Sequence, residues 1–358
     1  MIEPNPLPAF RNLDEVIDFL ITNSKGFFGV TISNDKISFK NRFGWQNTSW
    51  SEETKWLEKY CSLVAVDCEA LEWTESVEES FSWSHVSSET PFRFRTCLTF
   101  GMTHWDLVLR LLPNKVFPLS MVRLSDAVVD HFVHIDEGLV LVSGETGSGK
   151  SSTMASLIDH RLSQRSEKLY TAENPIEYLH TARPGCVVKQ IEVGEGKSVP
   201  DYQEAIRRAM RQDPDIILLQ ELRTPVEAVA ALDAALTGHV VVASLHASDP
   251  VTTIKRFVRW LEIYQGKNAD TDSLGRALKL VISQRMHTFR DHFAPIHEVL
   301  LASEANANAV ATQISNGRLS EMKNLIATGR SHGMVTFEHS RQELERELLR
   351  QQKKRSVG

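Results

Sequence analysis

Residues 143–153 read Ser-Gly-Glu-Thr-Gly-Ser-Gly-Lys-Ser-Ser-Thr and match the phosphate-binding loop pattern G-x-x-x-x-G-K-[ST]. Glycines let the backbone curl so that successive N–H groups point at phosphate oxygens. The apolar run 139–142 before the loop is typical of a buried strand, and residues 152–162 after it are typical of a helix. A chance glycine-rich turn would not be framed by a strand and a helix. The stretch therefore predicts an α/β fold that holds a nucleoside triphosphate.

The residues of this loop have separate predicted roles. Lys150 would neutralise the β and γ phosphates of ATP, and Ser151 would supply a hydroxyl ligand to Mg²⁺. The positive end of the helix that begins here would face the same anion. The predicted nucleotide-binding residues of the loop are Gly144, Thr146, Gly147, Ser148, Gly149, Lys150, Ser151 and Ser152.

The composition limits the class of protein. A length of 358 residues predicts about two domains, and a net charge of -6 argues against a nucleic-acid binder. The four cysteines form no C-x-x-C pair, which argues against a zinc knuckle and a disulfide scaffold. The N-terminus does not resemble a signal peptide, and no apolar run approaches the ~20 residues of a membrane span. We therefore expect a cytoplasmic protein whose contact with a membrane, if any, is peripheral.

The chain divides at a proline-containing segment. We predict a small N-terminal α/β domain at 1–112, a linker at 113–120, a P-loop domain at 121–340 and a charged helix or tail at 341–358. In the second part, strands and helices alternate, which indicates a mostly parallel sheet covered by helices. The predicted helices begin after Asn12 and span 51–60, 125–133, 152–162, 225–236, 251–261, 273–285, 319–327 and 341–355. The predicted strands span 28–33, 36–40, 80–84, 92–100, 139–142, 168–171, 215–219, 239–245 and 297–302.

Three later stretches supply the partners that a phosphate loop needs for hydrolysis, which are acids and a polar group at the carboxyl edge of the sheet. Glu173 and Glu177 follow one predicted strand, although surface acids beside an Asn-Pro turn would look the same. Glu221 follows four apolar residues, as the acid of a Walker B motif does. His246 ends the strand 239–245, where it could sense the γ-phosphate, hydrogen-bond to the acids or be structural.

Together these motifs resemble the ATPases of type II and type IV secretion systems. The segments that carry the resemblance are the phosphate loop, E-N-P-I-E-Y at 173–178, D-P-D-I-I-L-L-Q-E-L-R at 213–223 and T-G-H-V-V-V-A-S-L-H at 237–246. It covers roughly residues 91–340 and is closest to the pilus-retraction (PilT-like) branch and to the type IVB secretion and conjugation (DotB-like) branch. The four-cysteine zinc insert of the pilus-assembly ATPases is missing. Asn174, Gln220 and Thr224 depart from the family pattern, which puts the rate of hydrolysis in question.

The resemblance implies a PAS-like first domain and a RecA-like second domain in a homohexameric ring. Nucleotide would lie between the domains, with Arg93, Arg95 and Arg110 reaching it from the first domain. Two arginines two apart on a strand share one face, as an anion clamp requires, and surface solubility is the alternative explanation. The resemblance also adds His239 to the nucleotide-binding residues.

These observations predict a Mg²⁺-dependent ATPase that docks on inner-membrane platform or secretion-complex proteins. Glu221, helped by Glu177 or Glu173, would position the attacking water, and His246 completes the predicted catalytic set. Two rivals remain, a RecA-like motor that translocates DNA and a nucleotide-gated scaffold with little turnover. Pilus retraction and type IVB secretion or conjugation are not separable on these motifs.

Overall fold

The structure is a computed structural model that describes residues 7–24, 27–33, 36–41, 44–48, 56–64, 66, 76–85, 88–100, 105–113, 115–266, 269–290 and 292–357 of the chain. The chain forms two compact units, Met1–Lys115 and Val116–Gly358.

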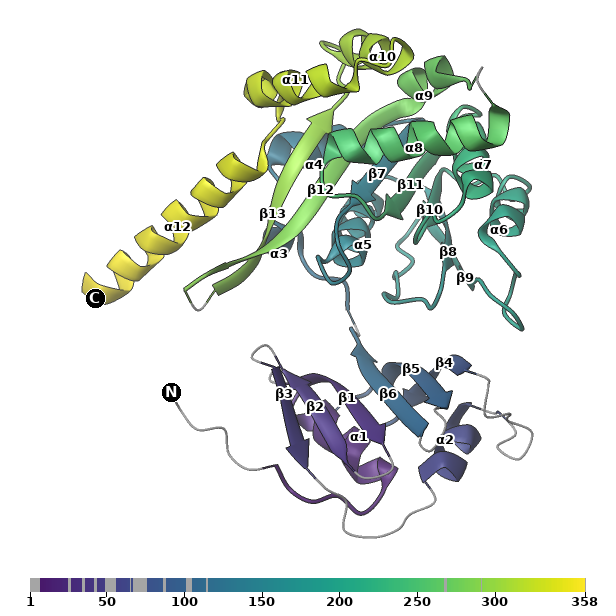
Figure 1. Cartoon of the computed structure of the whole chain (residues 1–358), viewed down its shortest axis with the longest axis vertical. Helices are drawn as coiled ribbons and strands as arrows, with labels where there is room; N and C mark the ends of the chain where they lie inside the picture. Colours follow the sequence, from purple (N-terminus) through teal and green to yellow (C-terminus); the bar gives the residue numbers. More distant parts are fainter. Residues whose placement is uncertain are drawn as a thin grey trace. The chain divides into compact units, whose positions relative to one another are not determined.

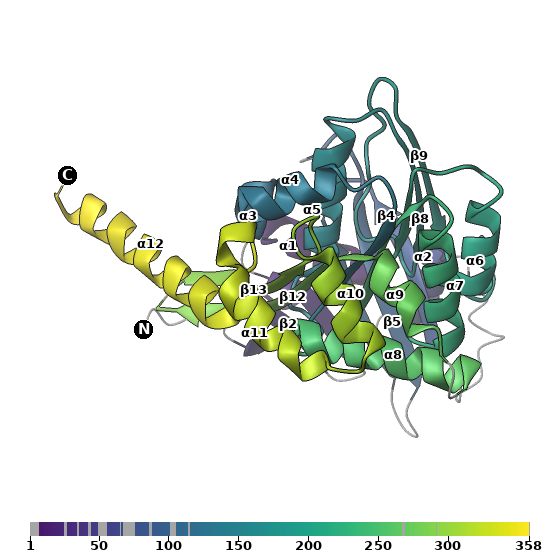
Figure 2. The same cartoon turned by 90° about the horizontal axis from the view of Figure 1, so that it is seen from above.

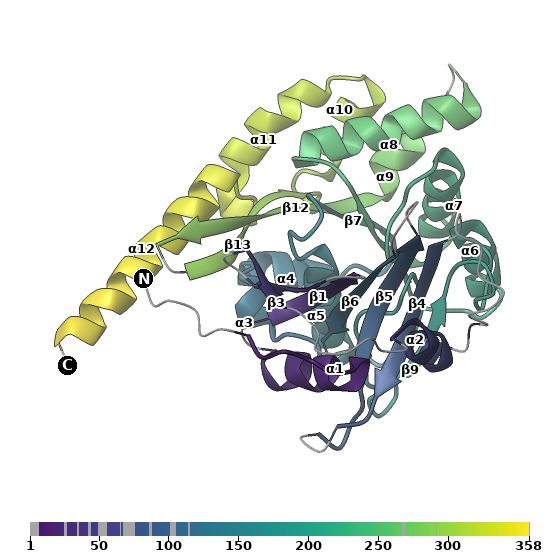
Figure 3. The same ribbon diagram turned by 60° about the horizontal axis from the view of Figure 1, so that its bottom comes forward.

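The N-terminal unit is a six-stranded antiparallel sheet in the order β3-β2-β1-β6-β5-β4. Helices α1 and α2 lie on one face of this sheet (Figure 3). The elements are α1 (Leu13–Thr22), β1 (Phe27–Ser33), β2 (Ile37–Asn41), β3 (Gly44–Thr48), α2 (Trp56–Val64), β4 (Ser76–Trp83), β5 (Phe92–Phe100) and β6 (Trp105–Leu112).

The first helix follows its sequence pattern closely. The side chain of Asn12 accepts a hydrogen bond from the backbone N–H of Glu15, which satisfies one free donor of the first turn. The carboxylate of Glu15 accepts in return from the N–H of Arg11, one residue before the cap. Five apolar side chains at helical spacing are buried against the sheet, as predicted: Leu13, Val16, Ile17, Leu20 and Ile21.

The C-terminal unit contains a seven-stranded sheet in the order β13-β12-β7-β11-β10-β8-β9 (Figure 1). All neighbouring strands are parallel except the β12–β13 hairpin, so the predicted mostly parallel sheet is confirmed. The strands are β7 (Gly138–Ser143), β8 (Lys168–Glu173), β9 (Val187–Glu192), β10 (Ile216–Leu219), β11 (Val240–Leu245), β12 (Leu278–Phe289) and β13 (His292–Leu301).

Helices cover both faces of this sheet. Seen from above, α3, α4 and α5 lie on one side, and α6, α7 and α8 lie on the other (Figure 2). Every residue of β7, β10 and β11 is buried, which explains why these strands read as continuous apolar runs. The helices are α3 (Leu119–Val122), α4 (Asp126–Val133), α5 (Lys150–Leu162), α6 (Tyr202–Ala209), α7 (Pro225–Ala235), α8 (Pro250–Gln265), α9 (Thr271–Ala277), α10 (Ala307–Ser315), α11 (Met322–Thr328) and α12 (Phe337–Val357), with 3-10 turns η2 (Leu319–Glu321) and η3 (Gly329–His332).

The last helix runs outward beside the β12–β13 hairpin (Figures 1 and 2). Leu344 and Leu348 of α12 pack against Ile296 of β13 in a small separate apolar cluster. The side chains of the basic tip, Lys353, Lys354 and Arg355, lie outside the described residues.

Some predicted elements differ from the structure. The helix predicted at 273–285 is wrong beyond residue 277, because the chain enters β12 at Leu278 and pairs with both β7 and β13. The apolar spacing there suits a helix, but pairing on both sides decides the outcome. Strands β3, β6 and β9 and helix α6 were not predicted. Residues 51–55 of the helix predicted at 51–60 lie outside the described residues, and the other half is confirmed as the start of α2, which continues to Val64.

Candidate nucleotide-binding and catalytic site

The phosphate loop connects β7 to α5 through residues 144–149. Gly144, Gly147 and Gly149 all have positive φ, at 152°, 80° and 89°. A Cβ on Gly144 would lie 2.3 Å from the carbonyl oxygen of Gln284, so only glycine fits there. α5 begins at Lys150, and its first-turn N–H groups therefore open toward the loop.

Lys150 lies across the loop that precedes it. Its Nζ donates to the carbonyl oxygens of Gly144, at 2.9 Å, and Glu145, at 3.0 Å. Burial lowers the pKa of Lys150, and the charges of Glu221 and Glu177 oppose this shift. The ammonium group therefore stands within electrostatic reach of two predicted acids. Within the described part of the chain, the buried Oγ of Ser148 has no hydrogen-bond partner, so the loop holds a free polar group that suits a phosphate ligand.

Gln284 of β12 supports the loop from behind, and sequence reasoning missed it. Its Nε2 donates to the carbonyl oxygen of Ser148, and its Oε1 accepts from Thr153 of α5 at 2.5 Å. The same oxygen lies 3.2 Å from Nε2 of His297. Burial lowers the pKa of His297 to about 3, so this histidine is neutral and can donate through Nε2. Gln284 fell within a stretch predicted to be helical, which concealed its place in the sheet.

Glu221 and His246 meet at the carboxyl edge of the sheet. Glu221 follows β10, and His246 follows the neighbouring parallel strand β11. The Nε2 of His246 lies 2.8 Å from Oε1 of Glu221, and Nη2 of Arg223 lies 2.8 Å from the other carboxylate oxygen. The Glu221 side chain is only 17% exposed. The histidine and the arginine thus hold one carboxylate in a fixed orientation beside Lys150.

Glu173 ends β8 and is buried. Burial raises its pKa to about 7, while hydrogen bonds from Thr171, Gln190 and the backbone N–H of Glu177 work in the opposite direction. A carboxyl group with this pKa gains and loses its proton near neutral pH, which suits a group that exchanges protons during turnover. Gln190 of β9 was not predicted, because β9 itself was not recognised.

The structure does not bring His239 to this edge. His239 precedes β11, at the amino end of the strand, where its carbonyl oxygen accepts from Gly138 N–H. Its Nδ1 lies 3.2 Å from the carbonyl oxygen of Ala234. The length of β11, about 20 Å, separates it from His246. The structure therefore does not bring His239 to the phosphate loop of its own unit, and its contact with nucleotide, which followed from the motif, stays a prediction.

The three predicted arginines share one face of the N-terminal sheet. Arg95 of β5 pairs directly with Arg110 of β6, and Arg93 is two residues from Arg95. Phe94, between them, points into the core on the opposite face. Arg95 lies 3.8 Å from Glu78, and Arg93 donates to the carbonyl oxygen of Pro113. The shared face is as predicted, and their contact with nucleotide stays a prediction.

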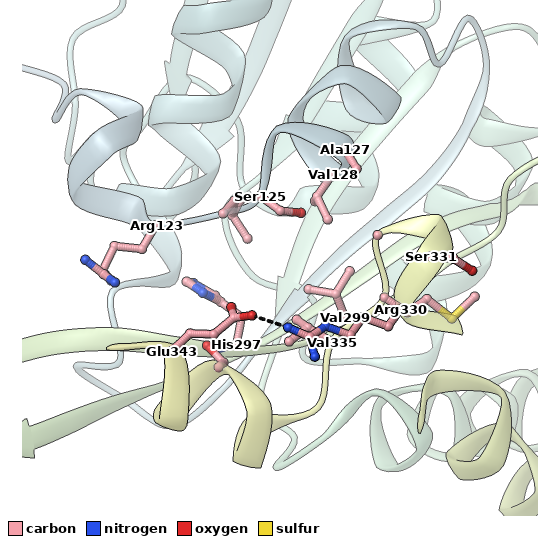
Figure 4. Close-up of a pocket in the computed structure, with 14 residues that line it drawn as sticks. Arg123, Ser125, Ala127, Val128, His297, Val299, Arg330, Ser331, Val335 and Glu343 are labelled. Carbon is pink, nitrogen blue, oxygen red and sulfur yellow. Dashed lines mark hydrogen bonds and ion pairs between the residues drawn. The ribbon is translucent and has the colours of Figure 1, made fainter. Parts of the chain in front are cut away.

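A cavity of about 240 Å³ lies elsewhere in the C-terminal unit (Figure 4). None of the predicted site residues lines it. Its two arginines are each paired with a glutamate of α12, Arg123 with Glu347 at 2.6 Å and Arg330 with Glu343 at 2.7 Å. The cavity therefore has no excess positive charge for a phosphate, unlike the loop beside Lys150.

The model of the family described as "Type II/IV secretion system protein" matches residues 84–357. The chain belongs to the type II/IV secretion system protein family. This confirms the resemblance drawn from the motifs, and with its complete phosphate loop the chain is an ATPase of this family.

Relatives and solved structures agree with this assignment. The chain is 34% identical to the type IV pilus retractation ATPase PilT of Pseudomonas aeruginosa, over 73% of this chain and 74% of that protein. It is 33% identical to the uncharacterized protein YggR of Escherichia coli, over 66% and 70% of the two chains. A crystal structure of the pilus retraction motor PilT with bound ADP has a TM-score of 0.74 at 27% identity, over 92% and 96% of the chains.

The fold is shared more widely than the sequence. The structure of the Legionella pneumophila ATPase DotB gives a TM-score of 0.70 at 21% identity, over 95% of this chain and 98% of that one. In the described part of this family member, no helix is long and apolar enough to cross a bilayer.

Proposed function

We propose that this protein couples Mg²⁺-dependent ATP hydrolysis to the motion of a membrane-anchored secretion, conjugation or type IV pilus machine. One observation carries the proposal. Lys150, Glu221 and His246 converge at the carboxyl edge of the sheet, with Glu221 held between His246 and Arg223. This is where ligands bind in open α/β sheets.

The residues divide the work of hydrolysis among them. The loop N–H groups and Lys150 bind the phosphates, and the Ser151 hydroxyl would hold Mg²⁺, which neutralises charge on the phosphates when it is bound. Glu221 orients the attacking water, and its bond to His246 keeps the carboxylate in place. Glu177 or Glu173 assists, and Glu173 does so most effectively near its pKa of about 7.

We further propose the larger assembly from the family resemblance. The domains are a PAS-like domain at 1–112, a linker at 113–120, a RecA-like domain at 121–340 and a charged helix or tail at 341–358, assembled as a homohexamer. Arg93, Arg95 and Arg110 complete a nucleotide site in this ring. They are suited to it because they lie on one face of the N-terminal sheet, opposite the face that packs into the core. The protein works in the cytoplasm and docks peripherally on inner-membrane platform or secretion-complex proteins.

The experiment compares the wild-type chain with Lys150→Ala in a steady-state ATPase assay with Mg²⁺. We expect turnover to fall by more than about 100-fold, because the phosphates lose their main cation. A wild-type rate in Lys150→Ala would contradict the proposed function. Lys323→Ala is the matched control, since Lys323 is an exposed lysine of α11, outside the site.

The same assay separates the rival functions. Tight ATP binding with negligible turnover of the wild-type chain would favour a nucleotide-gated scaffold. Stimulation of the ATPase by DNA but not by vesicles of anionic lipid would favour a DNA-translocating motor.

A further inference from the structure

The segment after β8, residues 174–186, carries Glu177 but contains no helix or strand of its own. Pro175 and Tyr178 are nevertheless buried. An irregular segment keeps a fixed conformation only when other groups satisfy its backbone N–H and C=O groups. Two glutamine side chains satisfy several of these groups, one from β9 and one directly after β10, and Glu192 of β9 also accepts from the N–H of Ile176 at 3.3 Å.

Gln220 provides the first attachment, directly after β10. Its Oε1 accepts from the backbone N–H of Asn174, and its Nε2 donates to the carbonyl oxygen of Pro175 at 3.2 Å. The amide therefore bridges two consecutive residues of the segment with one donor and one acceptor. Gln220 and Asn174 are both departures from the family pattern, and in this chain they contact each other.

Gln190 of β9 provides the second attachment, on the other side of β8. Its Oε1 accepts from the N–H of His180 at 2.9 Å. Its Nε2 donates to the carbonyl oxygen of Tyr178 at 2.9 Å and to Oε1 of Glu173 at 3.0 Å. One amide thus joins the buried acid to the middle of the segment.

The clamped segment also reaches the helix of the phosphate loop. The hydroxyl of Tyr178 lies 2.6 Å from Oγ of Ser152, in the first turn of α5. Lys150 and Ser151 stand immediately before Ser152. A shift of the segment would therefore move both the acids and the residues that hold phosphate and metal.

We propose that Gln190 and Gln220 are positioning residues that clamp the segment after β8 and thereby set where Glu173 and Glu177 stand relative to the phosphate loop. The proposal deepens the proposed function, on which it rests. The amide group is required because each clamp donates and accepts at once, whereas an ionised carboxylate can only accept.

The test uses the full chain and two readouts. Amide hydrogen exchange at Asn174 and His180 reports the clamps without any need for turnover. Steady-state ATPase assays then give kcat and KM. Gln190→Leu should expose His180 to exchange, and Gln220→Leu should expose Asn174. Each should lower kcat by about tenfold or more while KM for ATP changes by less than about threefold, since misplacing a catalytic group by 1 Å has effects of this size.

Gln190→Glu sharpens the test, because it keeps an acceptor for His180 but loses the donor to Glu173 and to the carbonyl oxygen of Tyr178. Its His180 exchange should stay slow while kcat falls. Gln164→Leu, at an exposed glutamine two residues after the end of α5, is the matched control and should change neither readout. Unchanged exchange in both leucine variants would overturn the clamp itself, even if hydrolysis failed. Faster exchange with an unchanged kcat would overturn the positioning role.

Discussion

The phosphate loop and the segment after β8 stand at the same edge of one sheet, yet they are held in different ways. The loop takes its shape from glycines with positive φ and from a helix that begins directly after it. The segment after β8 takes its shape from the side chains of Gln190 and Gln220, which lie on other strands. One is a local backbone structure, and the other is a product of tertiary contacts.

This difference has a consequence for how each region responds to substitution. A loop whose shape depends on local backbone geometry loses that shape when an added side chain clashes at a single position. A segment held by several side-chain hydrogen bonds loses them one at a time, at about 1 kcal/mol each for typical neutral bonds. The loop should therefore show all-or-none effects, and the segment should show graded ones.

The largest effect is expected for Gly144→Ala. The added Cβ would lie 2.3 Å from the carbonyl oxygen of Gln284 and 2.6 Å from Oγ of Ser148, so the loop must move. We expect ADP affinity, measured by calorimetry, to fall by more than about 100-fold, because backbone N–H groups supply much of the phosphate binding.

Gly147→Ala is the control for that experiment. Gly147 has a φ of +80° but nothing within 4 Å of its Cβ position. Gly147→Ala should weaken ADP binding by only roughly 1 kcal/mol, the cost of a left-handed backbone at a residue that carries a Cβ. Equal affinity in the two variants would show that the contact with Gln284 does not shape the loop.

The second effect concerns Glu173, whose ionisation at high pH lowers the free energy of unfolding. Its folded pKa of about 7 is above its ordinary value of 4.5, so the folded state favours the protonated form. The stabilisation from that proton is complete below pH 4.5 and is lost as the pH rises to about 7. Glu173→Gln removes this loss, so its free energy of unfolding should exceed that of wild type by an amount that grows to roughly 3 kcal/mol at pH 8.

Urea unfolding of both proteins at pH 5, 6, 7 and 8 measures the difference. Glu195→Gln, at an exposed glutamate, should show no such trend. A gap between Glu173→Gln and wild type that does not widen with pH would mean that Glu173 ionises as an ordinary surface acid, and the segment would then be more open than its hydrogen bonds indicate.

The same contrast explains how far the sequence could be interpreted. The phosphate loop, β7 and α5 were predicted because their signals are contiguous: an apolar run, glycines and a helix start. Glu173, Glu177, Glu221 and His246 were predicted because each lies at or shortly after the carboxyl end of a predicted strand, at one edge of the sheet. Gln190, Gln220 and Gln284 were not predicted as supports, since a glutamine that bonds to a distant backbone leaves no local pattern.

The fold shows this limit as well. β12 reads as a helix in isolation, and only its pairing with β7 and β13 makes it a strand. β9 is an edge strand in which only Ile191 is buried, so it lacks the apolar run that marks the central strands. α6 has a capping Asp201, but it is only eight residues long, and Glu204, Arg207 and Arg208 interrupt its apolar positions.

The smallest effect separates the two ends of β11, which carry the same residue type. His246 bonds to Glu221 at the carboxyl end, while His239 bonds to the carbonyl oxygen of Ala234 at the amino end. His239→Ala should leave kcat and KM for ATP within about twofold of wild type and lower the free energy of unfolding by about 1 kcal/mol, the typical loss for one hydrogen bond.

His246→Ala should instead lower kcat by about tenfold or more, because Glu221 loses the partner that orients it. Steady-state assays on both variants decide the matter: equal losses of kcat would mean that β11 acts as one stable unit and that position along the strand carries no information about function.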